Sequence, residues 1–158
     1  MVWNDGYGAG GGGLSSIFAR PAFQNSVRAT VGDQRAVPDV SMSAAVNGGA
    51  WVYYSADPSQ VGWGIFGGTS ESTPMFAGIV ALADQVAGHR LGDLNPALYA
   101  LAAHGYGPST GLVDITTGNN SFGAVTGYDA GAGYDLASGI GTVNGAKFVD
   151  TLAHTGGR

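Results

Sequence analysis

Hydrophobic and polar positions along the chain predict several short strands followed by one long apolar helix. Apolar residues alternate with serines over residues 39–44, which is the period of a strand. Residues 51–55 and 62–66 are rich in aromatic and β-branched side chains, so two more strands are predicted there. From Ser70 to about Gln85 the chain is apolar on most faces of a helix, which predicts a helix buried in the centre of the fold.

Shorter elements are predicted around this centre. Residues 2–5 have the pattern of the end of a strand, and residues 14–18 that of a short helical turn before a proline. A helix is predicted over residues 97–103 with Asn95 as its cap, because a proline follows Asn95 and a glycine stands beyond the end. A last helix is predicted over residues 144–152.

A glycine turn places a serine at the start of the long helix. Gly67 and Gly68 allow close approach of the backbone, and Ser70 follows directly, with Pro74 at an early helical position. The free N–H groups of a helix start can hold a developing oxyanion, which suits a nucleophile. The same residues also suit an ordinary helix start with Ser70 or Thr69 as its cap. Local chemistry leaves both interpretations open.

Length and composition exclude several classes of protein. The chain has 158 residues, which is enough for one domain, and it is 44% hydrophobic and only 11% charged, as in a folded protein. Its formal net charge of -5 and the lack of a basic run argue against a nucleic-acid surface. There is no cysteine, so a thiol nucleophile is excluded. No apolar run has the roughly 18 residues of a membrane span, and residues 1–5 lack the pattern of a signal peptide.

Two glycine-rich segments could bind a ligand. Residues 6–13 could cradle a phosphate, but Leu14 stands where a phosphate-binding loop needs a lysine. The second segment combines Asp114 with the run from Gly131 to Gly141, which could offer carboxylate and carbonyl oxygens to a hard cation. It lacks the alternating acids of an EF-hand, so its spacing alone favours a glycine-rich turn with two surface aspartates.

Several motifs, taken in order, resemble one family. They are Trp-Asn with a glycine run and Leu-Ser-x-x-Phe-x-x-Pro over residues 3–21, Pro-Asp-Val-Ser over 38–41, Gly-Thr-Ser-x-x-x-Pro over 68–74, and Gly-Tyr-Asp-Leu-x-x-Gly-x-Gly over 133–141. The chain resembles the subtilisin-like serine peptidases and their acid-acting relatives, the sedolisins (serine-carboxyl peptidases).

The order of residues separates these two branches. In subtilisin the histidine base precedes the serine, whereas His89, His104 and His154 all follow Ser70 here. Sedolisins use a glutamate base with a supporting aspartate, and a second aspartate near the oxyanion. The resemblance therefore implies a sedolisin-type endopeptidase with Ser70 as the nucleophile, acting on peptide or protein substrates in acid.

The resemblance also implies one calcium ion. Sedolisins bind it near their C-terminus through two aspartates and three backbone carbonyls. In this chain the corresponding residues are Asp114, Ile115, Gly131, Gly133 and Asp135. Asp129 lies close by as a candidate outer carboxylate.

The implied fold is α/β and subtilisin-like, with a parallel-sheet core and flanking helices. Residues 1–158 would form its C-terminal part, with the nucleophile helix over 70–87 and the calcium-site region over 114–141. Glu71, the only glutamate, is not the family's base, and no other glutamate is present to act as one. We therefore expect the base and the oxyanion aspartate to lie outside this sequence.

Three consequences are expected from this incomplete site. The chain alone should have little or no peptidase activity. It should also expose a sheet edge and its apolar helix. A partner that carries the N-terminal half could cover both surfaces. The family resemblance also implies an extracellular protein. The alternative is a non-catalytic calcium-binding fragment or degenerate module in which Ser70 is only a cap.

Overall fold

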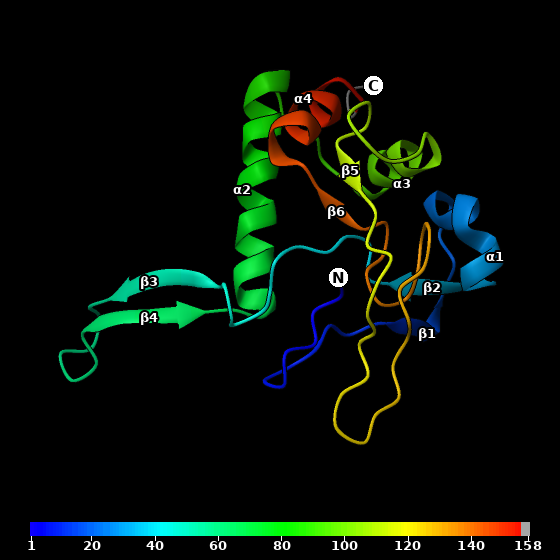
Figure 1. The fold of residues 1–158 in the computed structure, drawn as a ribbon. Coiled ribbons are helices and arrows are strands. Elements are labelled where there is room, and N and C mark those ends of the chain that lie inside the picture. Colours follow the sequence, from blue (N-terminus) through cyan, green and yellow to red (C-terminus); the bar gives the residue numbers. More distant parts are fainter. Residues whose placement is uncertain (156–158) are drawn as a thin grey trace.

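The computed structural model describes residues 1–155 (Figure 1). One long helix, α2, stands at the side of a body built from short strands, shorter helices and loops. The elements in chain order are β1 (Gly13–Ala19), the 3-10 helix η1 (Ala22–Val27), α1 (Arg28–Val31), β2 (Gln34–Val37), β3 (Ala50–Tyr54), β4 (Gly62–Phe66), α2 (Thr69–Ala87), α3 (Asn95–Ala103), β5 (Leu112–Val113), β6 (Thr142–Val143) and α4 (Gly145–Thr155).

The strands pair only in an antiparallel manner in the part of the chain that the structure describes. They form three two-stranded sheets, β1–β2, β3–β4 and β5–β6. The prediction of a parallel sheet is thus not met within residues 1–155. The strand predicted over 39–44 is not formed, because its backbone groups bond to loops instead: the Ser41 N–H donates to the Gly141 carbonyl, and the Ala44 carbonyl accepts from Gly68.

The helical turn predicted over 14–18 is also wrong, because these residues belong to β1. Gly13 pairs with Val37 and Leu14 with Ala36 on β2. Residues 2–5 hold only an isolated bridge from Asn4 to Ala9 rather than a strand end. In both places, pairing with a neighbouring segment determines the conformation, and local propensity does not report that pairing.

The predicted helices are confirmed, with changes at their ends. α2 begins at Thr69 and ends before Gly88, which adopts the left-handed conformation at φ 75° and caps the helix. Its N-cap is Gly68, without a side-chain cap bond, so neither Ser70 nor Thr69 is the cap. Asn95 is likewise the first residue of α3 rather than its cap. The last helix runs over Gly145–Thr155.

The core lies where α2, α3 and α4 meet the loops before β5 and β6. Phe148 of α4 is fully buried and faces Phe76 of α2, with 6.2 Å between the ring centroids. Tyr99 of α3 is also buried, and its ring lies 5.3 Å from that of Phe23 in η1. These aromatic contacts join α2 and α4 on one side of the core and α3 and η1 on the other.

Much of α2 is nevertheless exposed. Met75, Leu82 and Val86 are 38%, 53% and 54% exposed, so the prediction of burial on most faces is wrong in this structure. The β3–β4 hairpin extends away from the body (Figure 1) and carries exposed aromatic side chains, Trp51 and Trp63 among them. The expectation of an uncovered apolar helix is confirmed. Among residues 1–155, no helix combines the length and apolar character that crossing a membrane requires.

Candidate functional site

The turn between β4 and α2 is held in place by backbone contacts that only glycine permits. The Gly68 N–H donates to the Ala44 carbonyl at 2.6 Å, and Gly68 has φ 72°. A side chain on Gly67 would place its Cβ 2.8 Å from that same carbonyl oxygen and 3.0 Å from the Val46 nitrogen. The two glycines therefore fix the position from which Ser70 emerges.

Ser70 lies in the first turn of α2, where backbone donors are free. The first intrahelical bonds are made by the N–H groups of Glu71 and Ser72, which donate to the Gly68 carbonyl at 3.0 and 3.3 Å. The N–H groups of Thr69 and Ser70 come before these and have no earlier carbonyl in the helix to reach. Ser70 is exposed. Its surroundings can thus combine a hydroxyl with donors for an oxyanion.

Ser72, two residues after Ser70, plays a structural role. Its hydroxyl donates to the Ser43 carbonyl at 2.6 Å, which joins α2 to the segment before the hairpin. This bond and the Gly68–Ala44 bond tie the helix start to two adjacent carbonyls of the same segment.

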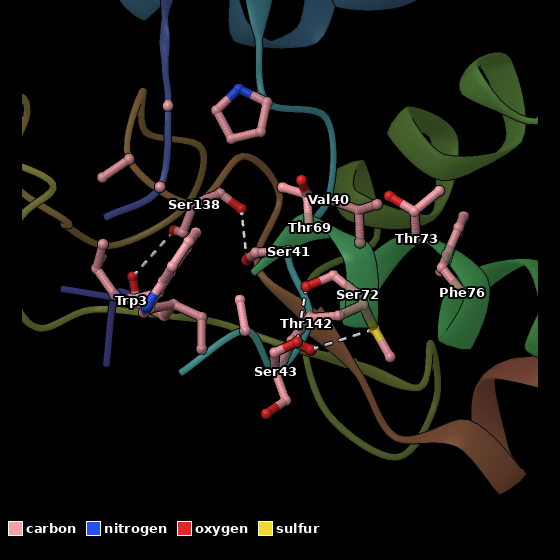
Figure 2. Close-up of a pocket in the computed structure, with 18 of the residues that line it drawn as sticks. Trp3, Val40, Ser41, Ser43, Thr69, Ser72, Thr73, Phe76, Ser138 and Thr142 are labelled. Atoms are coloured by element: carbon pink, nitrogen blue, oxygen red, sulfur yellow. Dashed lines mark hydrogen bonds between the residues drawn. The ribbon is translucent and has the colours of Figure 1, made fainter. Parts of the chain in front are cut away.

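A cavity of about 350 Å³ lies beside the same end of α2 (Figure 2). Thr69, Ser72, Thr73 and Phe76 line it from the helix, and Val40, Ser41 and Ser43 line it from the segment before the hairpin. Further lining residues come from the N-terminal loop, such as Trp3, and from the loop with Ser138. Ser70 is not among the lining residues, so the cavity and the exposed serine occupy different sides of the helix start.

Two side chains, Arg35 and Tyr99, hold the Asp39 carboxylate. It forms an ion pair with Arg35, and one carboxylate oxygen accepts from the Tyr99 hydroxyl at 2.8 Å. Tyr99 also accepts from the buried amide of Gln24 at 2.7 Å. Burial raises the pKa of Tyr99 well above its usual value, so the phenol stays protonated as a donor. The Tyr134 hydroxyl donates to the Pro38 carbonyl, and the network holds the wall of the cavity.

Asp5 is a positioning residue that our sequence analysis did not single out. One of its oxygens accepts from the N–H groups of Tyr7 and Gly8, and the other accepts from Val46 at 2.8 Å. Partial burial raises the pKa of Asp5, but these N–H donors outweigh it and hold the pKa below the usual value. Asp5 therefore connects the N-terminal loop to the segment around Val46, which lies against the Gly67 turn. An aspartate directly before a glycine is a local turn signal, but its long-range partner leaves no local pattern.

The predicted calcium residues come together in one region. The Gly133 N–H donates to Asp114 Oδ2 at 2.8 Å, and the Gly131 N–H donates to Asp135 Oδ2 at 2.9 Å. The carbonyl oxygen of Ile115 lies 3.5 Å from the hydroxyl oxygen of Ser138, which follows Asp135 in the same loop. Asp135 is 8% exposed and Asp114 is half-buried, so the interpretation as two surface aspartates is wrong.

These residues fit a hard cation. Asp114 Oδ1 is buried and has no hydrogen-bond partner among the residues that the structure describes. No lysine or arginine in residues 1–155 forms an ion pair with Asp114 or Asp135. Burial, and then the negative charges of these two aspartates, raise the pKa of Tyr106 to about 12. Asp135, in contrast, accepts hydrogen bonds at both oxygens, from Gly131 and from Ala137 and Ser138. One free carboxylate oxygen, with a second carboxylate and backbone carbonyls in the same region, is an oxygen-rich, negative setting of the kind that calcium prefers.

The other candidate side chains are placed as follows. His104 is the C-cap residue of α3, and all three histidines are exposed. Asp129 is exposed, with only a backbone bridge to Asn119, and its suggested outer role stays a prediction. In residues 1–155, no three histidine, aspartate or glutamate side chains cluster as a metal site, so a cation here needs backbone carbonyls as well.

Known proteins resemble this chain in sequence and in structure. Kumamolisin from Bacillus sp. (strain MN-32) is 36% identical over 160 residues, covering 96% of this chain and 27% of kumamolisin. Sedolisin from Pseudomonas sp. (strain 101) is 36% identical over 152 residues, covering 92% and 24%. Mouse tripeptidyl-peptidase 1 is 35% identical over 168 residues, covering 90% and 27%. No protein-family model matches the chain.

The fold agrees with these relatives. A solved structure of Pseudomonas sedolisin, a serine-carboxyl proteinase complexed with two molecules of pseudo-iodotyrostatin, matches 99% of this chain and 42% of that one. The TM-score is 0.83 at 31% sequence identity. The chain is a homologue of the sedolisin family. It spans about a quarter of the length of the curated relatives it matches.

For a sedolisin homologue, the position of Glu71 needs explanation. It is the only glutamate, and it follows Ser70 directly. Its side chain is 8% exposed, one carboxylate oxygen lacks a partner, and no hydrogen bond joins it to Ser70 within residues 1–155. The geometry does not present Glu71 as a base for Ser70, in agreement with the sequence analysis.

Proposed function

We propose that this chain is the nucleophile-bearing part of a sedolisin-type serine-carboxyl peptidase, with Ser70 as the nucleophile. The observation that carries the proposal is the position of Ser70 in a sedolisin homologue: an exposed hydroxyl in the first turn of α2, behind a turn that only glycine can form. Peptides or proteins are the substrate class that a peptidase family implies.

The chemistry is acyl transfer. The Ser70 oxygen attacks the carbonyl carbon of a peptide bond, and its proton passes to a carboxylate base. The amine leaves with a proton, and water then hydrolyses the acyl-enzyme. The free N–H groups at the start of α2 are placed to hold the oxyanion. Because Glu71 is the only glutamate in the sequence, we infer that the base comes from residues outside it.

A carboxylate base also determines the pH range. An unperturbed glutamate titrates near pH ~4, so activity should be found in acid. Operation outside the cell is part of the same proposal, and the scarcity of charged residues, 11% of the chain, suits an acidic medium.

We further propose that calcium binds to Asp114, Ile115, Gly131, Gly133 and Asp135. The unpartnered, buried Oδ1 of Asp114 supports this, together with the absence of an ion-pair partner for either aspartate in residues 1–155. A bound ion would neutralise both aspartates and tie the loop around Gly131 to the strand β5 region. The same site would remain in the alternative function, a non-catalytic calcium-stabilised module.

A chimera tests the catalytic proposal. Residues 1–155 of this chain replace the matching segment of Pseudomonas sedolisin, which then supplies the remaining groups, and peptidase activity is measured in acid. We expect activity that Ser70→Ala abolishes and that Ser59→Ala, in the exposed turn between β3 and β4, retains. A folded chimera without activity, or one in which Ser70→Ala keeps its activity, would favour the non-catalytic module.

A further inference from the structure

We infer that the turn at Asn47–Gly48 is a site of spontaneous deamidation, and that its products loosen the contacts that hold the start of α2. This inference goes beyond the proposed function. It concerns the backbone that lies against the Gly67 turn, and it does not require Ser70 to be a nucleophile.

An asparagine followed by glycine favours an intramolecular reaction. The backbone nitrogen of the glycine attacks the side-chain amide carbon of the asparagine and forms a new C–N bond. The amide nitrogen leaves as ammonia, taking up the proton of the attacking nitrogen, and a succinimide ring remains. Water then opens the ring at either carbonyl, which gives aspartate or isoaspartate with one new negative charge. Glycine promotes the attack because it places no Cβ beside its own nitrogen.

The Asn-Gly pair occurs twice in the sequence, at residues 47–48 and 144–145, and both asparagines are exposed. The backbone around the first pair is free to react. Neither the Asn47 carbonyl nor the Gly48 N–H takes part in a backbone hydrogen bond within residues 1–155. Gly48 has φ 96°, and a Cβ built on it would meet nothing within 4 Å. The attacking nitrogen is therefore accessible and unbonded.

The second asparagine is held by its helix. The Asn144 N–H donates to the Gly111 carbonyl at 2.8 Å, and the Asn144 carbonyl accepts from the Phe148 N–H at 2.8 Å. Phe148 is fully buried in the core. Ring closure turns the asparagine carbonyl away from the helix axis, so reaction at this position has to break the bond to Phe148. We therefore expect Asn47 to react while the fold protects Asn144.

Val46, directly before Asn47, connects the reactive turn to the start of α2. Its N–H donates to Asp5 Oδ2 at 2.8 Å, and its carbonyl accepts from the Gly49 N–H at 3.2 Å. A Cβ on Gly67 would lie 3.0 Å from the Val46 nitrogen and 3.1 Å from its Cα. The backbone of Val46 thus packs directly against the Gly67 turn, and a displacement of Val46 is transmitted to that turn.

Both products displace Val46. A carboxylate at residue 47 stands one residue from the N–H group that the Asp5 carboxylate holds, and two like charges at this spacing repel each other. Isoaspartate also directs the main chain through the former side chain, which adds one carbon before Gly49. Gly49 has no room to absorb the added length, because a Cβ there would lie 2.2 Å from the Phe66 carbonyl oxygen.

Mass spectrometry tests the assignment of the site. The unaltered chain, with its folding confirmed by circular dichroism, is kept in mildly alkaline buffer or in acid and then digested. Deamidation raises the mass of a peptide by about 1 Da. We expect it at residue 47 in the alkaline sample, where the attacking nitrogen loses its proton more readily, and at least about tenfold more slowly at Asn144. A sample unfolded in urea is the control, since both asparagines should then react at similar rates.

Hydrogen exchange measures the consequence for α2. The Gly68 N–H donates to the Ala44 carbonyl at 2.6 Å, so its exchange rate reports on the contacts of the helix start. Converted molecules carry an additional negative charge and can be separated by ion exchange. We expect faster exchange at Gly68 in the converted molecules. The matched control is Asn47→Gln, whose longer side chain disfavours ring closure, and which should keep its mass and its slow exchange after the same incubation.

Each outcome decides the inference. Conversion at residue 47 with protection of Asn144 in the folded chain, followed by faster exchange at Gly68, supports it. Absence of conversion at residue 47, or equal rates at both asparagines in the folded chain, overturns the assignment of the site. Conversion with unchanged exchange at Gly68 overturns the effect on α2. None of these measurements uses peptidase activity, so a failure of the proposed function would leave them unaffected.

Discussion

Calcium should stabilise this protein, and the change Asp114→Asn should remove the gain. Asp114 Oδ1 is buried without a partner, and the buried Asp135 carboxylate shares its loop region. A ligand present at about 100 times its dissociation constant adds about 2.7 kcal/mol to the free energy of unfolding. In a domain of this size, that corresponds to a rise in Tm of roughly 5–11 °C. Thermal unfolding followed by circular dichroism, in calcium and in chelator, measures this difference.

The variant should behave differently in the two conditions. The asparagine oxygen can still accept from the Gly133 N–H, while one negative charge beside Asp135 is lost. In chelator we therefore expect Asp114→Asn to melt no lower than the unaltered chain, and in calcium we expect it to gain little. The matched control is Asp150→Asn, because the Asp150 side chain is 77% exposed and distant in sequence from the loop. Equal destabilisation by Asp114→Asn in calcium and in chelator would refute the reasoning, since Asp114 would then be only a structural acceptor.

Two further predictions concern the tyrosines. Tyr99→Phe removes two buried hydrogen bonds, one of them to a carboxylate, and should lower the free energy of unfolding by roughly 2–4 kcal/mol in urea titrations. Tyr53→Phe, with a side chain that is 53% exposed, should change it by less than about 0.5 kcal/mol, and equal effects would contradict the network. Burial raises the pKa of Tyr134 and Tyr106 to about 12, above the unfolded value of about 10. Between these values the unfolded chain loses protons that the folded chain keeps, so stability should fall as the pH rises from about 10 to about 12, and Tyr134→Phe should weaken that fall.

The elements that were predicted correctly depend on local sequence. α2 is marked by a long apolar run between a glycine turn and Gly88, and the β3–β4 hairpin by two aromatic segments with a turn between them. The strand over 39–44 was predicted from an equally clear alternation and is not formed. A strand requires a neighbour, and the neighbours of this segment are the loop at Gly141 and the turn at Gly68. Sequence periodicity reports which side chains alternate but not which backbone lies alongside.

The candidate site was likewise predictable from the sequence only in part. The residues around Asp114 and Asp135 could be assigned only through the family resemblance, because their spacing alone favoured a surface turn. The structure brings them together through bonds from two glycine N–H groups, which no side-chain motif encodes. Asp5 was not identified as a positioning residue for a similar reason, since its partner Val46 lies 41 positions away.

In the proposed function, the placement of the nucleophile is separate from its activation. Ser70 is positioned by contacts that are all present here: Gly68 bonds to Ala44, Ser72 bonds to Ser43, and Asp5 holds Val46 beside them. The first two contacts join the start of α2 to the segment before the hairpin, and the third joins that segment to the N-terminal loop, so the contacts that hold the helix start all lie within this chain. A proton acceptor for Ser70, in contrast, requires a carboxylate that the buried Glu71 does not offer. A nucleophile that is prepared in one part and activated only when another part is bound would remain chemically inert until the two are together.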